Sequence, residues 1–314
     1  IASKILKSEK QNIDLILLDL IMPNVNGIEI LNKIKETKQL KNIPVIMLSA
    51  MDEIETIAEC ISLGAEDFLI KPINKILLNA RINNALEKKL FRDKEVEYQK
   101  QIKREKKLSN DLLLNILPLS IAERLKSGET LIADDIKSAT VLFSDLKGFT
   151  DLSSRISAKE LLILLNNIFT KFDKLAVKHS LEKIKTIGDN YMLAGGVPIE
   201  NSEHAISVAE MAIDMLRILP KIHKETGYKL RLRIGINTGP VSAGVIGTKK
   251  FIYDIWGDTV NMASRMESYG KDGHIHVTDA TYQLLKNTFT FEKCPLQNIP
   301  GKGKVVTYFL NNYK

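Results

Sequence analysis

Cysteine and long apolar runs are scarce in this chain, and each scarcity excludes a class of protein. Only two cysteines, Cys60 and Cys294, occur in 314 residues, and their wide separation fits neither a disulfide scaffold nor a paired zinc motif. Such cysteine usage is typical of a reducing, cytoplasmic compartment. No apolar run reaches the roughly 18 residues of a membrane-spanning helix, so we expect neither a membrane span nor a signal peptide in this segment.

An initiating methionine is also lacking. The chain opens on Ile1-Ala2-Ser3-Lys4, which we read as the interior of a helix and hence as the start of a fragment. Its 314 residues predict two domains at the usual ~100–200 residues each. A hydrophobic content of 44% and a charged content of 26% are ordinary for soluble domains that bury a core.

The net charge is +7, and much of this excess is local. Residues 87–107 carry nine Lys or Arg and five Asp or Glu, which leaves +4 in that stretch. A nucleic-acid surface usually interleaves aromatic side chains with basic ones, and this stretch offers only Phe91 and Tyr98. We therefore interpret it as the solvated face of a helix and expect no nucleic-acid partner.

Three short apolar runs separated by helical patterns occur in residues 1–81. The runs are Asp14–Leu20, Ile43–Ser49 and Asp67–Pro72. Short apolar runs between helices predict a parallel sheet that is buried on both faces. In such sheets functional residues lie at the carboxyl ends of the strands, which is where Asp19, Ser49 and Lys71 fall.

Residues 82–117 contain neither Pro nor Gly and are rich in Lys and Glu, which predicts one long helix. A heptad pattern tested over this helix has apolar residues at five of eight core positions. The apolar five are Phe91, Tyr98, Ile102, Leu112 and Ile116, and the polar three are Glu95, Glu105 and Ser109. The pattern favours a weak parallel coiled-coil dimer, with a solitary charged linker helix as the alternative.

Residues 136–314 predict a second unit of mixed helices and strands. Its elements follow from apolar periodicity, from turn residues and from a capping-box pattern. They are a strand at Ser138–Leu142, a helix that opens at the capping box of Ser157 and Glu160, a strand, turn and strand at Lys183–Leu193, a helix at His204–Leu219 and a strand at Leu230–Ile236.

Two carboxylates in this second unit stand at the ends of predicted strands. Asp145 follows the first strand, and Asp189 occupies the turn Ile187-Gly188-Asp189-Asn190. Carboxylates on adjacent strand ends can share a pair of hard divalent cations, and Mg²⁺ prefers a few carboxylates together with substrate phosphates. In a two-metal site one ion activates the attacking oxygen and the other steadies the leaving group. The pair therefore predicts metal-dependent chemistry on a phosphate substrate.

Residues 111–314, which contain both motifs, resemble the class III adenylyl/guanylyl cyclases. The matching stretches are Leu113–Pro118, Phe143–Thr150, Lys183–Met192, Ile234–Gly239 and Tyr253–Met266, of which the last is long and specific. The resemblance implies a ferredoxin-like βαββαβ catalytic domain. It also implies that Asp145 and Asp189 bind two Mg²⁺ or Mn²⁺ ions in each active site, with help from the Leu146 carbonyl.

In this family the residues that read the purine base correspond to Lys185 and Asp254. Adenine offers an acceptor at N1 and a donor at its 6-amino group, which a Lys donor and an Asp acceptor complement. Guanine offers the reverse, and members of the guanylyl type carry Glu and Cys at these places. A buried hydrogen-bonding site rejects a substrate that leaves its groups unpaired by up to ~10⁴-fold. The pair therefore favours ATP over GTP.

Further ribose and phosphate roles follow from the resemblance. Asn261 and Arg265 lie four residues apart, on one face of a helix. The resemblance implies that Asn261 orients the ribose and that Arg265 binds the α-phosphate, where a fixed guanidinium stabilises developing charge. The family also has a late phosphate-binding Lys in a Lys-Gly-Lys-Gly pattern. The corresponding Pro300-Gly301-Lys302-Gly303 lacks the first Lys, so Lys302 or Lys304 is the candidate substitute.

The N-terminal part resembles the response-regulator receiver domain from its second helix onward. The matching stretches are Asp14–Leu20, Met22–Gly27, Ser49-Ala50 and Gly64–Pro72. The resemblance implies that Asp19 accepts phosphate, that Ser49 and Lys71 contact the phosphoryl group, that Phe68 is the aromatic switch, and that the Ile21 carbonyl helps to hold Mg²⁺. The first strand, first helix and second strand of the family pattern are missing here, and with them the acidic pair that binds Mg²⁺. The sequence therefore leaves open whether this fragment can be phosphorylated.

Together these features predict a response-regulator adenylyl cyclase, a phosphorus–oxygen lyase that makes cyclic AMP. We expect an α/β receiver with a flavodoxin-like parallel sheet at residues 1–81, a helical dimerisation linker at 82–135 and an α+β cyclase domain at 136–314. The expected partners are ATP and a histidine kinase or phosphotransfer protein, and phosphorylation of Asp19 would shift the linker helices.

Class III sites form between two protomers, and this chain carries both halves of such a site. A homodimer would build two complete sites, and a monomer should be inactive. Two alternatives remain at this point: a guanylyl cyclase, and a degenerate cyclase that serves as a dimeric signalling scaffold. The intact metal pair argues against the scaffold, whereas Pro300 argues for it.

Overall fold

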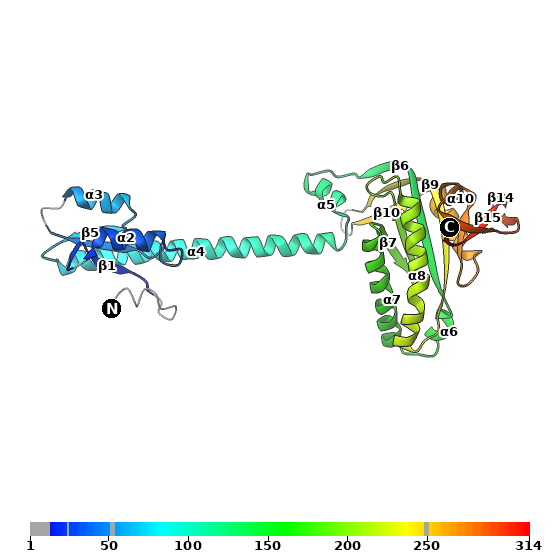
Figure 1. The fold of residues 1–314 in the computed structure, drawn as a ribbon, viewed down its shortest axis with the longest axis horizontal. Helices are drawn as coiled ribbons and strands as arrows, with labels where there is room; N and C mark the ends of the chain where they lie inside the picture. Colours follow the sequence, from blue (N-terminus) through cyan, green and yellow to red (C-terminus); the bar gives the residue numbers. More distant parts are fainter. Residues whose placement is uncertain (1–12, 24, 51–53, 248–250) are drawn as a thin grey trace. The chain divides into compact units, whose positions relative to one another are not determined.

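The computed structural model describes residues 13–23, 25–50, 54–247 and 251–314 (Figure 1). Two parts of the sequence patterns above lie outside these residues, namely Ile1-Ala2-Ser3-Lys4 and Asn24. The chain divides into two compact units, residues 1–109 and 110–314. Within the described residues, no helix is both long enough and apolar enough to cross a membrane.

The first unit contains a parallel three-stranded sheet in the order β1-β4-β5. Its strands are β1 (Ile16–Asp19), β4 (Val45–Ser49) and β5 (Asp67–Ile70), so the three predicted apolar runs are confirmed as strands. A small hairpin of β2 (Ile21–Met22) and β3 (Val25–Asn26) follows β1.

Helices cover both faces of this parallel sheet. α2 (Gly27–Glu36) and α3 (Ile54–Ser62) pack on one face, where Leu31 and Cys60 join the buried cluster. The helix α4 (Lys75–Leu114) packs on the other face through Ala85. Burial on both faces explains why these strands consist of nearly continuous apolar residues.

The helix α4 (Lys75–Leu114) starts earlier and ends earlier than the predicted range 82–117. Its first turns begin early because Leu78, which precedes the predicted start, packs against the apolar cluster on the sheet. A tertiary contact of this kind stabilises helical turns that local sequence preference does not reveal.

The second unit is built on one mixed sheet in the order β12-β15-β11-β9-β6-β8-β7, and β10 pairs with β9. The strands are β6 (Ala133–Lys147), β7 (Glu182–Ile187), β8 (Asn190–Gly195), β9 (Arg231–Ile246), β10 (Ile252–Trp256), β11 (Ile275–Thr278), β12 (Phe289–Lys293) and β15 (Thr307–Tyr313). Neighbouring strands are antiparallel except for β9 and β11. A separate hairpin consists of β13 (Gln297–Ile299) and β14 (Gly303–Val305).

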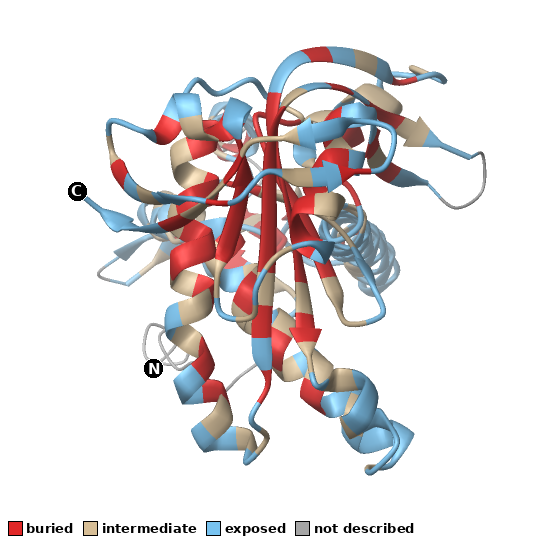
Figure 2. Cartoon of the chain, turned by 90° about the vertical axis from the view of Figure 1, so that its right-hand side faces the viewer, coloured by how far each residue is buried: buried red, intermediate tan, exposed pale blue. Residues whose placement is uncertain are grey.

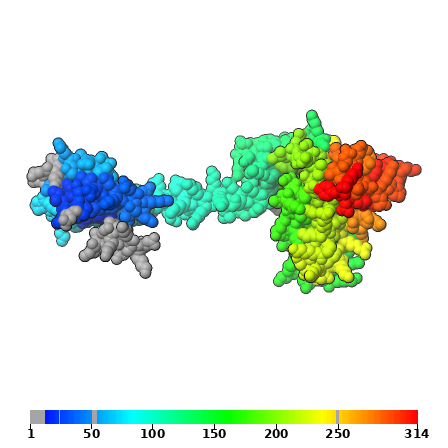
Figure 3. All heavy atoms as spheres, viewed as in Figure 1, coloured from blue at the N-terminus to red at the C-terminus, as the bar shows by residue number. Residues whose placement is uncertain are grey.

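Helices lie on both faces of this sheet as well. One face carries α7 (Ala158–Lys178), α8 (His204–Thr226) and α10 (Asp279–Leu285), and the other carries α5 (Leu119–Lys126) and α9 (Asp258–Ser268). A short α6 (Phe149–Ser153) follows β6. Figure 2 shows that the buried residues concentrate on the strands and on the helix sides that face them. In Figure 3 the C-terminal strands, orange to red, lie beside the yellow-green α8.

Several predicted boundaries in this unit were too narrow. The strand expected at Ser138–Leu142 is part of the much longer β6, so Asp145 lies inside the strand rather than after it. The helix expected to end at Leu219 continues through Pro220 to Thr226. The predicted capping box is confirmed, because the Ser157 side chain accepts a hydrogen bond from the Glu160 backbone N–H and the Glu160 carboxylate accepts one in return.

Candidate active site

Asp145 and Asp189 come together at one end of the pair formed by β6 and β8. These strands are antiparallel with Ser144 opposite Tyr191, so the next residue of β6, Asp145, reaches the start of β8. There its carboxylate lies close enough to that of Asp189 for its charge to act on the pKa of Asp189. Burial, and then the charge of Asp145, raise the pKa of Asp189. Neighbouring carboxyl groups of this kind favour a shared proton or cation.

A tight turn presents Asp189 at this place. Ile187 at the end of β7 pairs with Asn190 at the start of β8, so only two residues connect the strands. The first of them, Gly188, has a φ of 63°. Two-residue hairpins need positive φ at this first position, which glycine adopts without a steric cost. The pattern that predicted the turn therefore also fixes where Asp189 projects.

Two cations lie beside this acid pair, and the sequence patterns did not single them out. Arg233 stands opposite Asp145 in the pairing of β6 with β9, and its Nη2 lies 3.4 Å from Asp145 Oδ2. Lys147 Nζ lies 3.6 Å from the same oxygen. Arg233 takes a polar position in the alternating strand Leu230–Ile236, and a basic residue there, on the side opposite the apolar residues, was the available signal.

The predicted base-reading residues Lys185 and Asp254 contact each other. Lys185 Nζ on β7 donates a hydrogen bond of 2.5 Å to Asp254 Oδ2 on β10. Their side chains are 36% and 13% exposed, respectively. The neighbours Tyr253 and Ile255 point into the core, so strand alternation turns Asp254 to the opposite side. The other Asp254 oxygen, Oδ1, accepts a hydrogen bond of 2.9 Å from the Ile255 backbone N–H.

Helix α9 carries Asn261 and Arg265, as predicted. Arg265 Nη1 donates a hydrogen bond of 2.5 Å to the backbone carbonyl of Pro300, in the turn between β13 and β14. Lys302, from the same turn, forms an ion pair of 2.7 Å with Asp258 at the start of α9. The helix and the turn are thus joined at two points, and both predicted phosphate-binding cations have partners within the chain.

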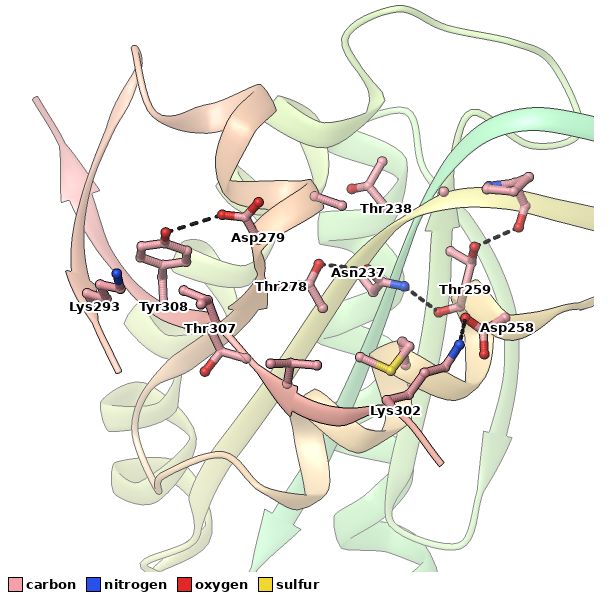
Figure 4. A pocket seen from close by; sticks show the side chains of 16 residues that line it. Asn237, Thr238, Asp258, Thr259, Thr278, Asp279, Lys293, Lys302, Thr307 and Tyr308 are labelled. Atoms are coloured by element: carbon pink, nitrogen blue, oxygen red, sulfur yellow. Dashed lines mark hydrogen bonds and ion pairs between the residues drawn. The ribbon is translucent and has the colours of Figure 1, made fainter. Parts of the chain in front are cut away.

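A cavity of about 630 Å³ lies behind this turn, between the start of α9 and the C-terminal strands (Figure 4). Its walls include Lys302, Asp258, Thr278 and Tyr308. Among the predicted site residues only Lys302 lines it, and the metal acids and the base-reading pair do not. Within the described residues, no hydrogen bond or ion pair joins Asp145 directly to Lys185, Asp254, Asn261 or Arg265.

In the first unit the predicted phosphate-accepting group lies at the carboxyl edge of the sheet. Asp19 ends β1, and Lys71 Nζ forms an ion pair of 2.5 Å with Asp19 Oδ2. Ser49 ends the neighbouring strand β4 and is buried, and its hydroxyl donates to the Ala50 carbonyl at 3.2 Å. Phe68 in β5 packs on the buried cluster beneath. The structure therefore brings Asp19 and Lys71 together as the motif predicts.

Comparison with known proteins accounts for both units. The family model of the adenylate and guanylate cyclase catalytic domain matches residues 131–312. The chain belongs to the class III nucleotidyl cyclases. The response regulator receiver domain matches residues 2–83, so a receiver domain precedes the cyclase domain. Both resemblances seen in the sequence, and the fold class that they imply, are thereby confirmed.

The relatives of this cyclase divide between two activities. An adenylate cyclase of Mycobacterium tuberculosis is 44% identical over 203 residues, which cover 64% of this chain and 46% of that protein. The human guanylate cyclase soluble subunit beta-2 is 39% identical over 237 residues, which cover 74% of this chain and 38% of that protein. The chain thus spans less than half the length of these two relatives.

A solved structure adds a third comparison for the cyclase domain. The catalytic core of a rhodopsin-guanylyl cyclase with converted specificity, in complex with ATPalphaS, is 41% identical and has a TM-score of 0.56. The match covers 57% of this chain and 98% of that chain. The shared fold is therefore that of the catalytic domain.

Class III cyclases generally use divalent metal ions, and the acid pair of this cyclase fits that requirement. Among the residues that the structure describes, no group of three or more His, Cys, Asp or Glu could hold a metal by itself. One or two carboxylates suffice for Mg²⁺ when substrate phosphates complete its shell. The proximity of Asp145 to Asp189, which raises the pKa of Asp189, suits such an ion. The contribution of the Leu146 carbonyl stays a prediction.

Proposed function

We propose that this cyclase is an adenylyl cyclase that converts ATP to 3′,5′-cyclic AMP and pyrophosphate. The observation that carries the proposal is the contact between Lys185 and Asp254. A Lys donor and an Asp acceptor held side by side match the acceptor N1 and the donor 6-amino group of adenine. Guanine would place its own donor against Lys185 and its own acceptor against Asp254, which leaves polar groups unpaired.

Each remaining residue has a role that its position supports. Asp145 and Asp189 hold two Mg²⁺ or Mn²⁺ ions with the nucleotide phosphates, and Arg233 stands beside them. When bound, such ions activate the ribose 3′-oxygen and stabilise the leaving pyrophosphate. Asn261 orients the ribose, and Arg265 stabilises the charge that develops on the α-phosphate.

Pro300 occupies the position of the family's phosphate-binding Lys, and Lys302 takes over that role. ATP must then compete with the partners that these cations have in the chain. The Pro300 carbonyl contacts Arg265, and Asp258 contacts Lys302. Both partners lie on the surface, where hydrogen bonds and ion pairs are weak and easily exchanged for a triphosphate.

We infer that the active enzyme is a homodimer with a site between its protomers. The acid group and the base-reading group occupy separate elements of one chain, and no direct polar contact joins them among the described residues. Residues 82–135 would act as the dimerisation linker between the receiver at 1–81 and the catalytic domain at 136–314. The apolar heptad residues support this role, because Phe91, Tyr98 and Ile102 are exposed on α4.

The receiver domain is proposed to regulate the cyclase through Asp19. A histidine kinase or phosphotransfer protein would supply the phosphoryl group, and the nearby Lys71 would contact it. Transfer to Asp19 would shift the linker helices and with them the geometry of the catalytic dimer. A donor phosphoprotein, or a small phosphodonor, should therefore change the cyclase rate of the wild-type chain and leave Asp19→Asn unaffected.

A nucleotide competition assay tests the proposed reaction. The purified chain is supplied with ATP and GTP together in the presence of Mn²⁺, and both cyclic products are measured. Cyclic AMP should dominate, and Asp189→Ala should abolish it. Equal product from wild type and Asp189→Ala would refute the catalytic role and favour the signalling scaffold. A preference for GTP would refute the interpretation of Lys185 and Asp254 and favour a guanylyl cyclase.

A further inference from the structure

Glu267, near the end of α9, is a buried acid for which the proposed mechanism has no use. Its side chain is only 6% exposed. A carboxylate in such a place is costly unless it is paired and hydrogen-bonded. Arg233 is the oppositely charged partner of Glu267. Its Nε donates a hydrogen bond to Glu267 Oε1 at 2.6 Å, and its Nη2 lies 2.6 Å from the same oxygen. The second oxygen accepts a hydrogen bond of 3.1 Å from the Ser268 hydroxyl.

The guanidinium of Arg233 is shared between two acids. Its Nη2 lies 2.6 Å from Glu267 but 3.4 Å from Asp145. The shorter contact holds the guanidinium on the side of α9. Asp145 consequently keeps a carboxylate that is not closed off by a tight ion pair. A metal ion competes for the same oxygens as a cationic side chain, so this difference in distance matters for metal binding.

Backbone packing enforces this arrangement. Gly235 lies two residues after Arg233 and therefore faces the same side of β9. A Cβ at Gly235 would come within 1.9 Å of the Glu267 backbone nitrogen, so α9 approaches β9 as closely as the backbone allows. His276 Nδ1 also lies 2.9 Å from the Met266 carbonyl, which ties the same end of α9 to β11. The position of the Glu267 carboxylate is thus set by the fold.

We propose that Glu267 is a positioning residue that holds Arg233 away from the metal ligand Asp145. The proposal rests on the metal role given to Asp145 and Asp189 in the proposed function. Without the charge of Glu267, Arg233 should turn to Asp145 and form a tighter ion pair with it. That pair would neutralise the carboxylate and compete with the cation, although no metal-contacting atom has been removed.

Mn²⁺ binding to the nucleotide-free chain, followed by electron paramagnetic resonance of the free ion, tests this proposal. Glu267→Gln should weaken Mn²⁺ binding by roughly tenfold, the lower end of the loss seen when a residue that supports a metal ligand is changed. The double variant Glu267→Gln with Arg233→Gln removes the competing cation, and it should regain most of the affinity. Asp214→Asn is the matched control, since it removes a paired acid that contacts Lys178 and His179 instead.

The outcomes separate the possibilities. Wild-type Mn²⁺ affinity in Glu267→Gln would overturn the proposal, as would a loss that the double variant fails to restore. An equal loss in Asp214→Asn would overturn it too, because the effect would then be general.

Asp189→Ala tests the metal site itself: if it binds Mn²⁺ like wild type, the proposed metal site fails and this inference with it. If Asp189→Ala loses Mn²⁺ while Glu267→Gln does not, only the positioning role fails. A thermal melt of each variant identifies any that do not fold.

Discussion

Lys185 and Asp254, which lie 69 positions apart in the sequence, form a hydrogen-bonded ion pair of 2.5 Å between two strands. The pair joins β7 to β10, and the residues that flank Asp254, Tyr253 and Ile255, are fixed in the core beneath. A donor and an acceptor are therefore held side by side before any nucleotide arrives. Preorganised hydrogen-bonding groups discriminate well because a mismatched partner leaves them unpaired.

Exchange of this pair should exchange the substrate. The double variant Lys185→Glu with Asp254→Cys places the guanylyl-type residues at both positions, and an acceptor then faces the guanine N1–H. We expect the ratio of ATP to GTP turnover to fall by at least roughly 100-fold, which is within the range of hydrogen-bond discrimination. The ratio of kcat/KM values for the two nucleotides measures the effect. An unchanged ratio in an active, folded double variant would show that the base is read elsewhere.

Two inactive variants should restore activity to each other if the site lies between protomers. Asp189→Ala damages the acid half of the site, and Arg265→Ala damages the phosphate half. A heterodimer purified through two different tags then contains one intact site and one doubly damaged site, so about half of the wild-type rate is expected. A heterodimer as inactive as either parent would mean that each site forms within one chain.

The local motifs predicted only part of this site. They predicted residues whose positions depend on neighbours in the sequence, and they missed a residue whose partners lie far away along the chain. Asp189 sits in a two-residue turn whose conformation Gly188 dictates, so neighbouring residues suffice to predict it. Arg233 was missed because its partners Asp145 and Glu267 lie 88 and 34 positions away. Only the pairing of β6 with β9 and the close packing of α9 bring these three together.

The same limit applies to the fold. The parallel strands of the receiver were evident because burial on both faces requires continuous apolar runs. The start of α4 was not evident, since its first turns depend on Leu78 packing against the cluster that contains Ile46 of the sheet. The full length of β6 was likewise hidden, because its exposed end has no apolar alternation and is held by pairing with β9.

A charge on the apolar stripe of α4 should dissociate the dimer. Ile102 is 56% exposed in the single chain and belongs with Phe91 and Tyr98 to an exposed apolar stripe, which a partner would cover. Ile102→Glu should raise the dissociation constant by more than tenfold and lower cyclase activity at low protein concentration. Val96→Glu, on the same helix but away from the heptad stripe, adds the same charge at an exposed apolar residue and should have little effect. Sedimentation analysis of both variants decides, and similar behaviour of the two would contradict the coiled coil.

The stability of the cyclase domain should fall as pH rises from about 4.5 to about 7, through Glu182. Burial raises the pKa of Glu182 from its ordinary value of 4.5 to about 7. In this interval the unfolded chain releases a proton that the folded chain keeps, so rising pH favours unfolding. Glu182→Gln removes this cost and should stabilise the fold by roughly 1–2 kcal/mol above pH 7, after allowance for partial exposure, and by little near pH 4. Urea unfolding at pH 4.5 and 8 measures both values, and a gain of the same size at both would contradict the assignment to Glu182.

A single methyl group at Gly235 should damage both the fold and the reaction. The added Cβ would meet backbone atoms of Glu267 and Met266 at 1.9–2.5 Å, and backbone cannot move aside as a flexible side chain can. Helix α9 must then shift away from β9 and carry Asn261 and Arg265 with it. We expect Gly235→Ala to lose roughly 2 kcal/mol or more of stability, and most of its cyclase activity even where it remains folded.

Gly227→Ala separates this clash from the general effect of losing a glycine, because Gly227 has a φ of 77° and nothing within 4 Å of the new Cβ. Backbone strain alone should cost it about 1–2 kcal/mol and leave the rate per folded molecule intact. Equal rates per folded molecule in the two variants would show that the position of α9 does not control the reaction.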